Sequence, residues 1–292
     1  MSDEADFFRA IQENPADDSA RVAYADWLEE RGDIRQEYLR LNKRGRSSFS
    51  LTFGLCDAKM ACMPRRPRVA PGGLVYHVLN RAVARLALFE KDSDYGAFER
   101  VMAEALLEHP TRLLAYCIMP NHWHLVVWPR KAGELTHFLR WLTHTHVMRW
   151  HAHFGTSGSG HLYQGRFKAF PIQTDEHFYT VVRYVERNAL RANLVAQAED
   201  WRWSSLWRRT FGTPQQKLLL SDWPLPELSR WRAHVNAPQS EAEVRAVREA
   251  IRRGCPFGSP LWQKRTAGRL GLDWTLRARG RPRKDQGPAD QP

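Results

Sequence analysis

The order of strand-like and helix-like segments in the middle of the chain constrains the fold most strongly. Strand-like segments are rich in β-branched and aromatic residues, and helix-like segments repeat apolar residues at three- and four-residue spacing. The segments are, in chain order, a strand at 73–80, a helix at 92–109, strands at 112–119 and 122–128, a helix at 132–154, a strand at 166–172 and a helix at 175–190. A Pro120–Asn121 turn predicts a hairpin between the second and third strands, and Pro171 places the last strand at a sheet edge. The order βαββαβα predicts an α+β fold, a ferredoxin-like antiparallel sheet with packed helices.

The charge of the chain divides it into unlike parts. Residues 1–34 carry a net charge of −7, whereas the 292 residues together carry +12, so +19 falls on the remainder. An excess of this size attracts a polyanion such as nucleic acid, although a basic balance can also serve solubility alone. We expect five regions: an acidic helical segment at 1–44, a linker at 45–63, a main domain at 64–210, a helical C-terminal region at 211–275 and a basic tail at 276–292.

Two capped helices are expected in the C-terminal region. Ser240 and Glu243 form a capping box that opens the first helix, and Ser259 with Pro260 opens the second. Such a pair resembles a helix-turn-helix, but capped helix pairs are also common in proteins without this motif. The tryptophan-rich stretch WRWSSLW at 201–207 is expected to be a linker.

The basic run RARGRPRK at 277–284 has an RGRP core that resembles an AT-hook. An arm of this kind suits narrow minor grooves, so Arg279 and Arg281 are expected to bind duplex DNA. A generic solvated basic tail is the alternative.

Composition excludes several classes of protein. The longest apolar runs, such as LLAYCI at 113–118, are too short to span a bilayer. The acidic N-terminus lacks the basic and apolar regions of a signal peptide. The 4 cysteines form no CxxC pair, which argues against a zinc ribbon and a disulfide framework. We therefore expect a globular, cytoplasmic protein with no membrane partner.

Three His-x-His pairs occur, and their expected backbone separates them. His122 and His124 lie on a strand, where side chains two apart point to the same face and can share one metal ion. The other pairs lie on a helix, where positions two apart differ by about 200° and cannot chelate. The histidines of that helix are expected at the surface or facing DNA: His137, His144, His146, His151 and His153.

The helix at 175–190 carries two polar residues beside its apolar face. At about 100° per residue, Tyr184 and Asn188 stack on one flank of the stripe that runs from Phe178 to Ala189. Both can lean towards the strand that carries the two histidines. The alternative is that a tyrosine at the rim of an apolar face serves packing alone.

Three stretches, MPNHWHLVVWP, GHLYQGRFKAFPI and YVERNALRANLV, resemble the REP-associated tyrosine transposases. These belong to the HUH single-tyrosine transposases of bacterial insertion sequences. The resemblance covers about residues 64–210, and the later RRGCPFGSPLWQKRTAGRLGL and RGRPRK look like the family's C-terminal extension. The stretches YADWLEERGD and EYLRLNKR within 1–44 resemble the repeat-companion segment of large bacterial proteins, which has no established chemistry.

The resemblance implies a metal-dependent transposase and endonuclease. In the family's pattern His122 and His124 would bind Mg²⁺ or Mn²⁺, and Tyr184 would be the nucleophile. Asn188 stands where relatives supply a third ligand, often Gln, and its side chain is one methylene shorter. The implied substrate is single-stranded DNA folded at hairpins, cleaved and rejoined through a 5′-phosphotyrosine intermediate that frees a 3′-OH.

Basic and aromatic residues interleave near this site, a pattern that suits base stacking plus phosphate contact. The expected DNA contacts are Arg81, Gln164, Arg166 and Lys168. His77 faces either the DNA or the core. A nucleoid-associated protein is expected, as a monomer or a homodimer, with the site formed within one chain or between two. The alternatives are a non-catalytic DNA-binding regulator and a metal-dependent hydrolase without covalent attachment.

Overall fold

The computed structural model describes residues 23, 24, 26, 27 and 70–277. The helices expected within 1–44, the linker at 45–63, and Arg279 with Arg281 in the tail lie outside the described residues, apart from four positions of the first segment. The centre of the molecule is a four-stranded sheet, antiparallel throughout, with the order β2-β3-β1-β4. The strands are β1 (Val75–Arg81), β2 (Arg112–Met119), β3 (His122–Trp128) and β4 (Lys168–Ile172). This confirms the predicted α+β fold, and β4 lies at an edge as Pro171 indicated.

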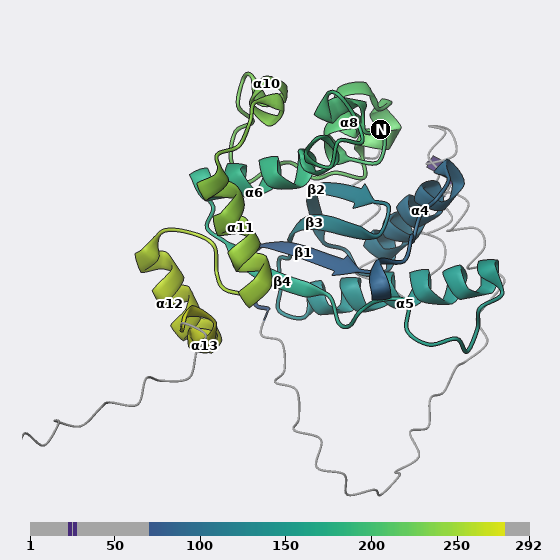
Figure 1. Cartoon of the computed structure of the whole chain (residues 1–292), viewed down its shortest axis with the longest axis horizontal. Coiled ribbons are helices and arrows are strands. Elements are labelled where there is room, and N and C mark those ends of the chain that lie inside the picture. The colour runs from purple at the N-terminus through teal and green to yellow at the C-terminus, as the bar shows by residue number, and fades with distance from the viewer. Residues whose placement is uncertain (1–22, 25, 28–69, 278–292) are drawn as a thin grey trace, which may run out of the picture.

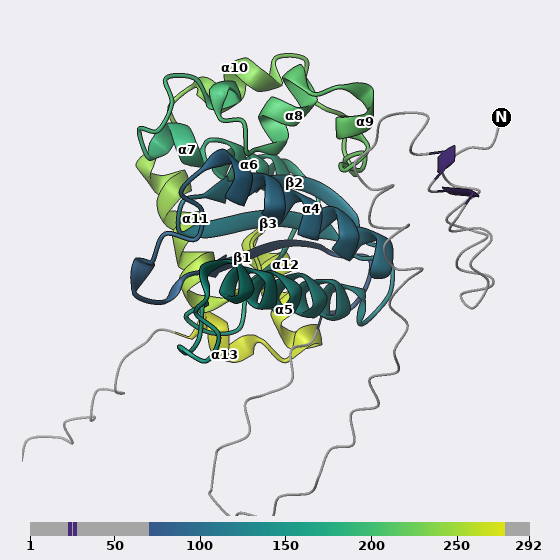
Figure 2. The ribbon, with the colours of Figure 1, turned by 90° about the vertical axis from the view of Figure 1, so that its right-hand side faces the viewer.

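Two long helices cover one face of the sheet. They are α4 (Asp92–Glu108) and α5 (Glu134–Phe154), which pack against each other and lie in front of the sheet in Figure 2. Phe98 and Phe138 from these helices bury with Trp123 of β3 in one apolar cluster. Trp123 lies between the two histidines of its strand, so both histidines must point to the opposite face.

The opposite face is covered by α6 (Glu176–Glu186) and α7 (Asn188–Arg191), with α11 (Glu241–Arg253) packed alongside on α6 and β4 (Figure 1). The single helix expected at 175–190 is thus interrupted at Arg187, where φ is −80° and ψ is 0°. The hydrogen-bond ladder continues through the interruption, because Arg187 N–H bonds to the Arg183 carbonyl and Arg191 N–H to the Arg187 carbonyl. Residues four apart across the junction therefore still share one flank.

The tryptophan-rich stretch does not form an extended linker as expected. It contains the helix α8 (Ser205–Phe211), and it packs along the outer edge of β2. The N–H of Ile118 donates to the carbonyl of Trp203, and the side chain of Ser205 exchanges hydrogen bonds with the backbone of Tyr116. The reason is that an edge strand leaves backbone groups unpaired, and this stretch satisfies them.

The C-terminal helices begin and end where their caps predicted. Ser240 and Glu243 form the capping box of α11, and Gly254 ends that helix in the left-handed conformation with φ 70°. The second predicted helix is α12 (Pro260–Leu270). It packs with α13 (Asp273–Leu276), whereas α11 packs on α6 and β4, so a helix-turn-helix arrangement stays a prediction.

The remaining short elements are η2 (Val83–Arg85), η3 (Ala198–Asp200), α9 (Pro214–Lys217) and α10 (Trp231–Asn236). Among the described helices, none combines the length and the apolar character that crossing a bilayer requires.

Candidate metal and tyrosine site

His122 and His124 lie side by side on the face of the sheet that α6 covers. Their ring centroids are 5.0 Å apart. His122 pairs with Arg81 of β1, and His124 with Leu79, so the β1 positions opposite them share this face. The strand alternation that the sequence predicted therefore puts both imidazoles where one ion can reach them.

Tyr184 of α6 lies against these histidines within the same chain. Its ring centroid is 6.0 Å from that of His124, and the two rings meet edge to face at 81°. Asn188, four positions later on α7, lies on the same flank, and both side chains are buried at 6% and 7% exposure. The structure thus brings the pair Tyr184 and Asn188 next to a pair of histidines about 60 positions earlier in the sequence, with Tyr184 in contact with His124.

Arg191 contacts both of these polar residues, and sequence reasoning missed it. Its guanidinium carbon lies 4.0 Å from the centre of the Tyr184 ring, and its Nη2 donates to Oδ1 of Asn188 at 2.9 Å. Burial lowers the pKa of Arg191, partly offset by the charge that Tyr184 can carry. The sequence spacing could have indicated Arg191. It lies three positions after Asn188 and seven after Tyr184, and positions with this spacing share one flank of a helix.

His77 of β1 joins the two histidines, which answers the question that the sequence left open. Its side chain is 0% exposed, and its Nε2 is 2.9 Å from Nδ1 of His124. The two rings are stacked with centroids 5.0 Å apart. His77 therefore lies in the core at the back of the site.

The environment keeps these imidazoles neutral. Burial lowers the pKa of His77 to about 3. Burial, followed by the charges of Arg81 and Arg191, lowers the pKa of His122 to about 4. Burial together with its histidine and arginine neighbours holds the pKa of His124 well below its usual value. Neutral imidazole is the form that binds a divalent metal ion, so the ligands need no deprotonation at neutral pH.

The donor set fits a small divalent cation. Nδ1 of His122 is 2.7 Å from Oδ1 of Asn121, and Nδ1 of His124 is engaged by His77, which leaves Nε2 on each ring. Oδ1 of Asn188 accepts one hydrogen bond from Arg191 and has a second lone pair. The amide Nδ2 of Asn188 has no hydrogen-bond partner in the described part of the chain. Two imidazoles and one amide oxygen leave coordination positions open for substrate oxygen.

A second group of possible metal ligands lies at the other end of α6. Asp175, Glu176 and His177 place their ligand atoms within 4.8 Å of one another. Asp175 is the N-cap of α6 and accepts from the backbone N–H of His177. This cluster caps the helix, about two and a half turns away from Tyr184 along the axis.

Two of the predicted DNA contacts, Arg81 and Lys168, lie on strand positions that share the face of the two histidines. Arg81 pairs with His122 across the strands, and the backbone N–H of Gln164 donates to the carbonyl of Arg81 at 2.9 Å. Lys168 pairs with Leu79, the same β1 residue that pairs with His124, so all three share one face. Arg166 is exposed in the preceding loop.

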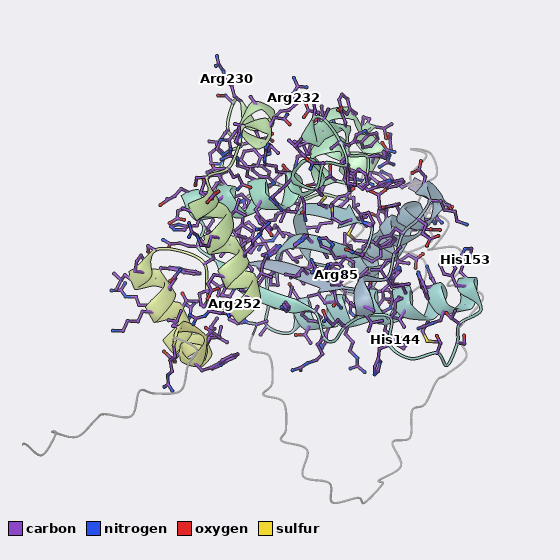
Figure 3. All side chains as sticks on the ribbon, viewed as in Figure 1. Arg85, His144, His153, Arg230, Arg232 and Arg252 are labelled. Carbon is purple, nitrogen blue, oxygen red and sulfur yellow. The ribbon has the colours of Figure 1, made fainter. Side chains whose placement is uncertain are left out.

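A polar cavity opens beside the end of β1. It encloses about 370 Å³ and is lined by Arg81, Ala82, Ala84, Arg85 and Gln164. Ala84 and Arg85 have positive φ angles of 49° and 60°, which side-chain-bearing residues seldom adopt. Arg85, labelled in Figure 3, is a basic residue at this cavity that the sequence did not single out.

One of the helix histidines is not at the surface as expected. His146 is 5% exposed, and its Nδ1 is 2.7 Å from the hydroxyl of Tyr163, to which Trp123 also donates at 2.9 Å. The reason is helical spacing, since position 146 is four residues after buried Leu142 and continues the apolar stripe of α5. The other four helix histidines lie at least partly at the surface, as His144 and His153 do in Figure 3.

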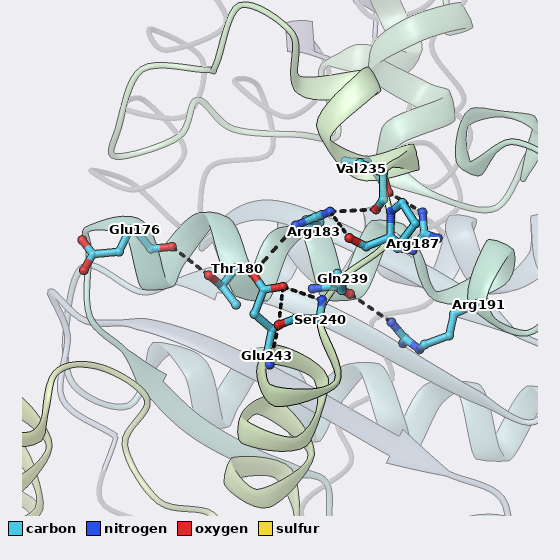
Figure 4. Close-up of polar contacts among 11 residues, drawn as sticks. Glu176, Thr180, Arg183, Arg187, Arg191, Val235, Gln239, Ser240 and Glu243 are labelled. Carbon is cyan, nitrogen blue, oxygen red and sulfur yellow. Dashed lines mark hydrogen bonds and ion pairs between the residues drawn. The ribbon is translucent and has the colours of Figure 1, made fainter.

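The helix that carries Tyr184 is braced by a C-terminal segment (Figure 4). Arg183 donates to the carbonyls of Ala237 and Pro238, and Arg187 donates to those of Val235 and Asn236. These contacts join residues about 50 positions apart. We call residues 235–243 the bracing segment. It reaches the site itself through Gln239, whose Oε1 is 3.4 Å from Nη1 of Arg191.

The four-stranded sheet thus carries two histidines on a central strand, next to a tyrosine on the helix that covers them. Residues 72–188 match the family described as "Transposase IS200 like". The match begins just before β1, spans the sheet and ends at Asn188. It confirms the resemblance to a transposase family that the sequence motifs indicated.

One similar solved structure is entitled "Structure of the REP associates tyrosine transposase bound to a REP hairpin". It is 17% identical, covers 61% of this chain and 98% of its own, and has a TM-score of 0.39. No curated protein matches the chain.

Proposed function

We propose that this protein is a metal-dependent DNA transposase that cleaves and rejoins single-stranded hairpin DNA through a 5′-phosphotyrosine intermediate. The observation that carries the proposal is the packing of Tyr184 against His124 within one chain. The match of residues 72–188 to the IS200-like transposases supports the same activity. A cytoplasmic, nucleoid-associated location follows from a DNA substrate.

Each residue of the site has a chemical role in this proposal. His122 and His124 would hold Mg²⁺ or Mn²⁺, with Asn188 as the third ligand. The bound cation would polarise the scissile phosphate and stabilise the charge that develops on its oxygens. The Tyr184 oxygen attacks the phosphorus and loses its proton to solvent, the bond to the 3′ oxygen breaks, and that oxygen takes up a proton as the free 3′-OH.

Arg191 supports the nucleophile. A guanidinium packed on the Tyr184 ring helps to hold that ring against His124. The same guanidinium holds Asn188, so one residue orients the nucleophile and a ligand together. Since all of these groups come from one chain, the proposed active site assembles in cis.

The DNA enters over the basic side of the sheet. Arg81, Arg85 and Gln164 line a cavity beside His122, and Lys168 lies on the same face as His124. Arginine and lysine bind phosphates, and a polar cavity accepts an unpaired nucleotide beside the cleaved bond.

An adduct assay tests the proposal. End-labelled hairpin single strands are incubated with the protein and Mn²⁺ and run on a denaturing gel. We expect a covalent protein–DNA adduct that disappears with EDTA and with Tyr184→Phe. The matched control is Tyr179→Phe, a tyrosine of the same helix whose hydroxyl donates to the Pro226 carbonyl outside the site.

The alternatives give different outcomes in this assay. Cleavage that persists in Tyr184→Phe would indicate a metal-dependent hydrolase without covalent attachment. Binding of the hairpin without any cleavage would indicate a DNA-binding regulator.

A further inference from the structure

Among the residues that the structure describes, His77 has one polar contact, and that contact is to His124. Its pairing partners on the neighbouring strands are Val126 and Phe170, and the ring of Phe170 lies edge-on at a centroid distance of 5.0 Å. Tyr184 lies on another side at 6.4 Å. Nδ1 of His77 has no hydrogen-bond partner within the described residues. The hydrogen bond to His124 is therefore the one polar interaction that the described surroundings of His77 offer it.

That hydrogen bond decides which nitrogen of His124 carries the proton. One proton lies between Nε2 of His77 and Nδ1 of His124, which are 2.9 Å apart. When Nδ1 of His124 carries it, Nε2 of that ring has a free lone pair on the open side. When His77 carries it instead, Nε2 of His124 holds a proton and cannot bind a cation.

We infer that His77 is a positioning residue that accepts the Nδ1–H of His124 and so presents Nε2 of His124 to a divalent cation. The inference rests on the proposed metal site and adds to it a residue outside the pair of ligands. Partners of this kind hold a ligand ring in one tautomer and one orientation. Stacking of the two rings at an interplanar angle of 11° fixes the orientation further.

The test is Mn²⁺ binding measured by calorimetry in the metal-free full chain. His77→Phe keeps an aromatic ring but removes the acceptor, and we expect Mn²⁺ to bind about 10- to 100-fold more weakly. His77→Gln offers a carbonyl oxygen to the same N–H, and we expect partial recovery of the affinity. If His77→Phe does not fold, His77→Leu replaces it. The matched control is His146→Phe, which removes a buried histidine on the other face of the sheet and should leave Mn²⁺ affinity unchanged.

A second measurement reads the tautomer directly, without metal or substrate. Long-range ¹H–¹⁵N correlation spectra of the metal-free protein distinguish a proton on Nδ1 from one on Nε2. We expect His124 to carry its proton on Nδ1 in the wild type and in His77→Gln, and to lose that preference in His77→Phe.

The outcomes separate this inference from the proposed function. A wild-type protein that binds no Mn²⁺ would overturn the metal site itself, whatever His77 does. Equal affinities of the wild type and His77→Phe would overturn the inference alone. Loss of binding in both His77 variants to the level of His124→Ala would also overturn it, because His77 would then be a direct ligand.

Discussion

At the scale of single residues, polar side chains are buried on both faces of the sheet. His77, His124 and Asn188 are buried on the face that carries the site, and His146 is buried on the other face, where it and Trp123 both bond to the Tyr163 hydroxyl. A buried polar group is costly unless it is hydrogen-bonded, and most of these make only one contact. Because the core would pack at lower cost with apolar residues at these positions, the ones near Tyr184 are best explained by the chemistry of the site.

The buried histidines predict how stability depends on pH. Burial lowers the pKa of His146 to about 3, so the folded protein keeps this ring neutral while the unfolded chain protonates near its usual value. Between about pH 6.5 and 3 the unfolded state therefore binds more protons, and the free energy of unfolding falls as the pH falls. Above this window both states are neutral and the contribution is constant.

We expect His146→Gln to reduce this dependence by up to about 1.4 kcal/mol per pH unit, the contribution of one proton. Urea denaturation at a series of pH values measures it. The exposed His144→Gln is the control and should keep the wild-type slope. Parallel curves for His146→Gln and the wild type would show that His146 titrates normally in the folded protein.

At the scale of elements, the helix pair α6–α7 depends on the bracing segment. Arg183 is 6% exposed and donates to two carbonyls of that segment, at 2.7 and 3.0 Å. Removing the guanidinium leaves both carbonyls without this donor. It also frees the helix turn that precedes Tyr184.

We expect Arg183→Met to lower the free energy of unfolding by about 1–3 kcal/mol, the range for buried hydrogen bonds to a charged group. DNA cleavage should fall further than Mn²⁺ affinity, because the tyrosine helix moves while β3 keeps its histidines. Urea denaturation, adduct yield and calorimetry measure the three quantities. The exposed Arg245→Met serves as the control, and an unchanged stability of Arg183→Met would contradict the bracing role.

The elements themselves were largely predictable. The bounds of β2 and β3 agree with the prediction, because alternation and the Pro120–Asn121 turn are local signals. The two pairs of site residues were predictable because the strand and helix periods fix which side chains share a face. The strand period puts His122 beside His124, and the helix period puts Tyr184 beside Asn188.

The contacts between elements were not predictable in the same way. The link from His77 to His124 requires the register of β1 against β3, which no local pattern specifies. Contacts of Arg183 and Arg191 with the bracing segment join positions about 50 residues apart. The tryptophan-rich stretch was expected to be a linker because the element that it packs against, the edge of β2, lies about 90 residues earlier in the chain.

At the scale of the whole molecule, the C-terminal helices are part of the core that supports α6. Trp231 and Val235 of α10 are buried in the same apolar cluster as Phe178 and Tyr184. The indole N–H of Trp231 donates to Glu186, a carboxylate that is 0% exposed. The family match ends before these helices, yet the helix that carries the tyrosine packs against them.

We expect a chain that ends at Gly212 to lose at least about 3 kcal/mol of unfolding free energy, because large apolar surfaces of α6 and β4 become exposed. Urea denaturation compares it with the full chain. A chain that ends at Arg277 keeps α10 to α13 and should match the full chain in stability. Equal midpoints for all three chains would show that the sheet and helices α4 to α8 are stable without the C-terminal region.

The coverage of the sheet edges has a consequence for how copies of this chain can meet. Along β2 the backbone groups of Leu113, Leu114, Tyr116 and Ile118 already bond to residues that follow the family match. At β4 the carbonyl of Pro171 and the N–H of Gln173 bond to Phe257. Within the described residues, both edges of the sheet therefore have backbone groups already bonded, which disfavours strand addition by a second copy at these positions. We expect two copies of this chain to meet through helix surfaces rather than through these strand edges.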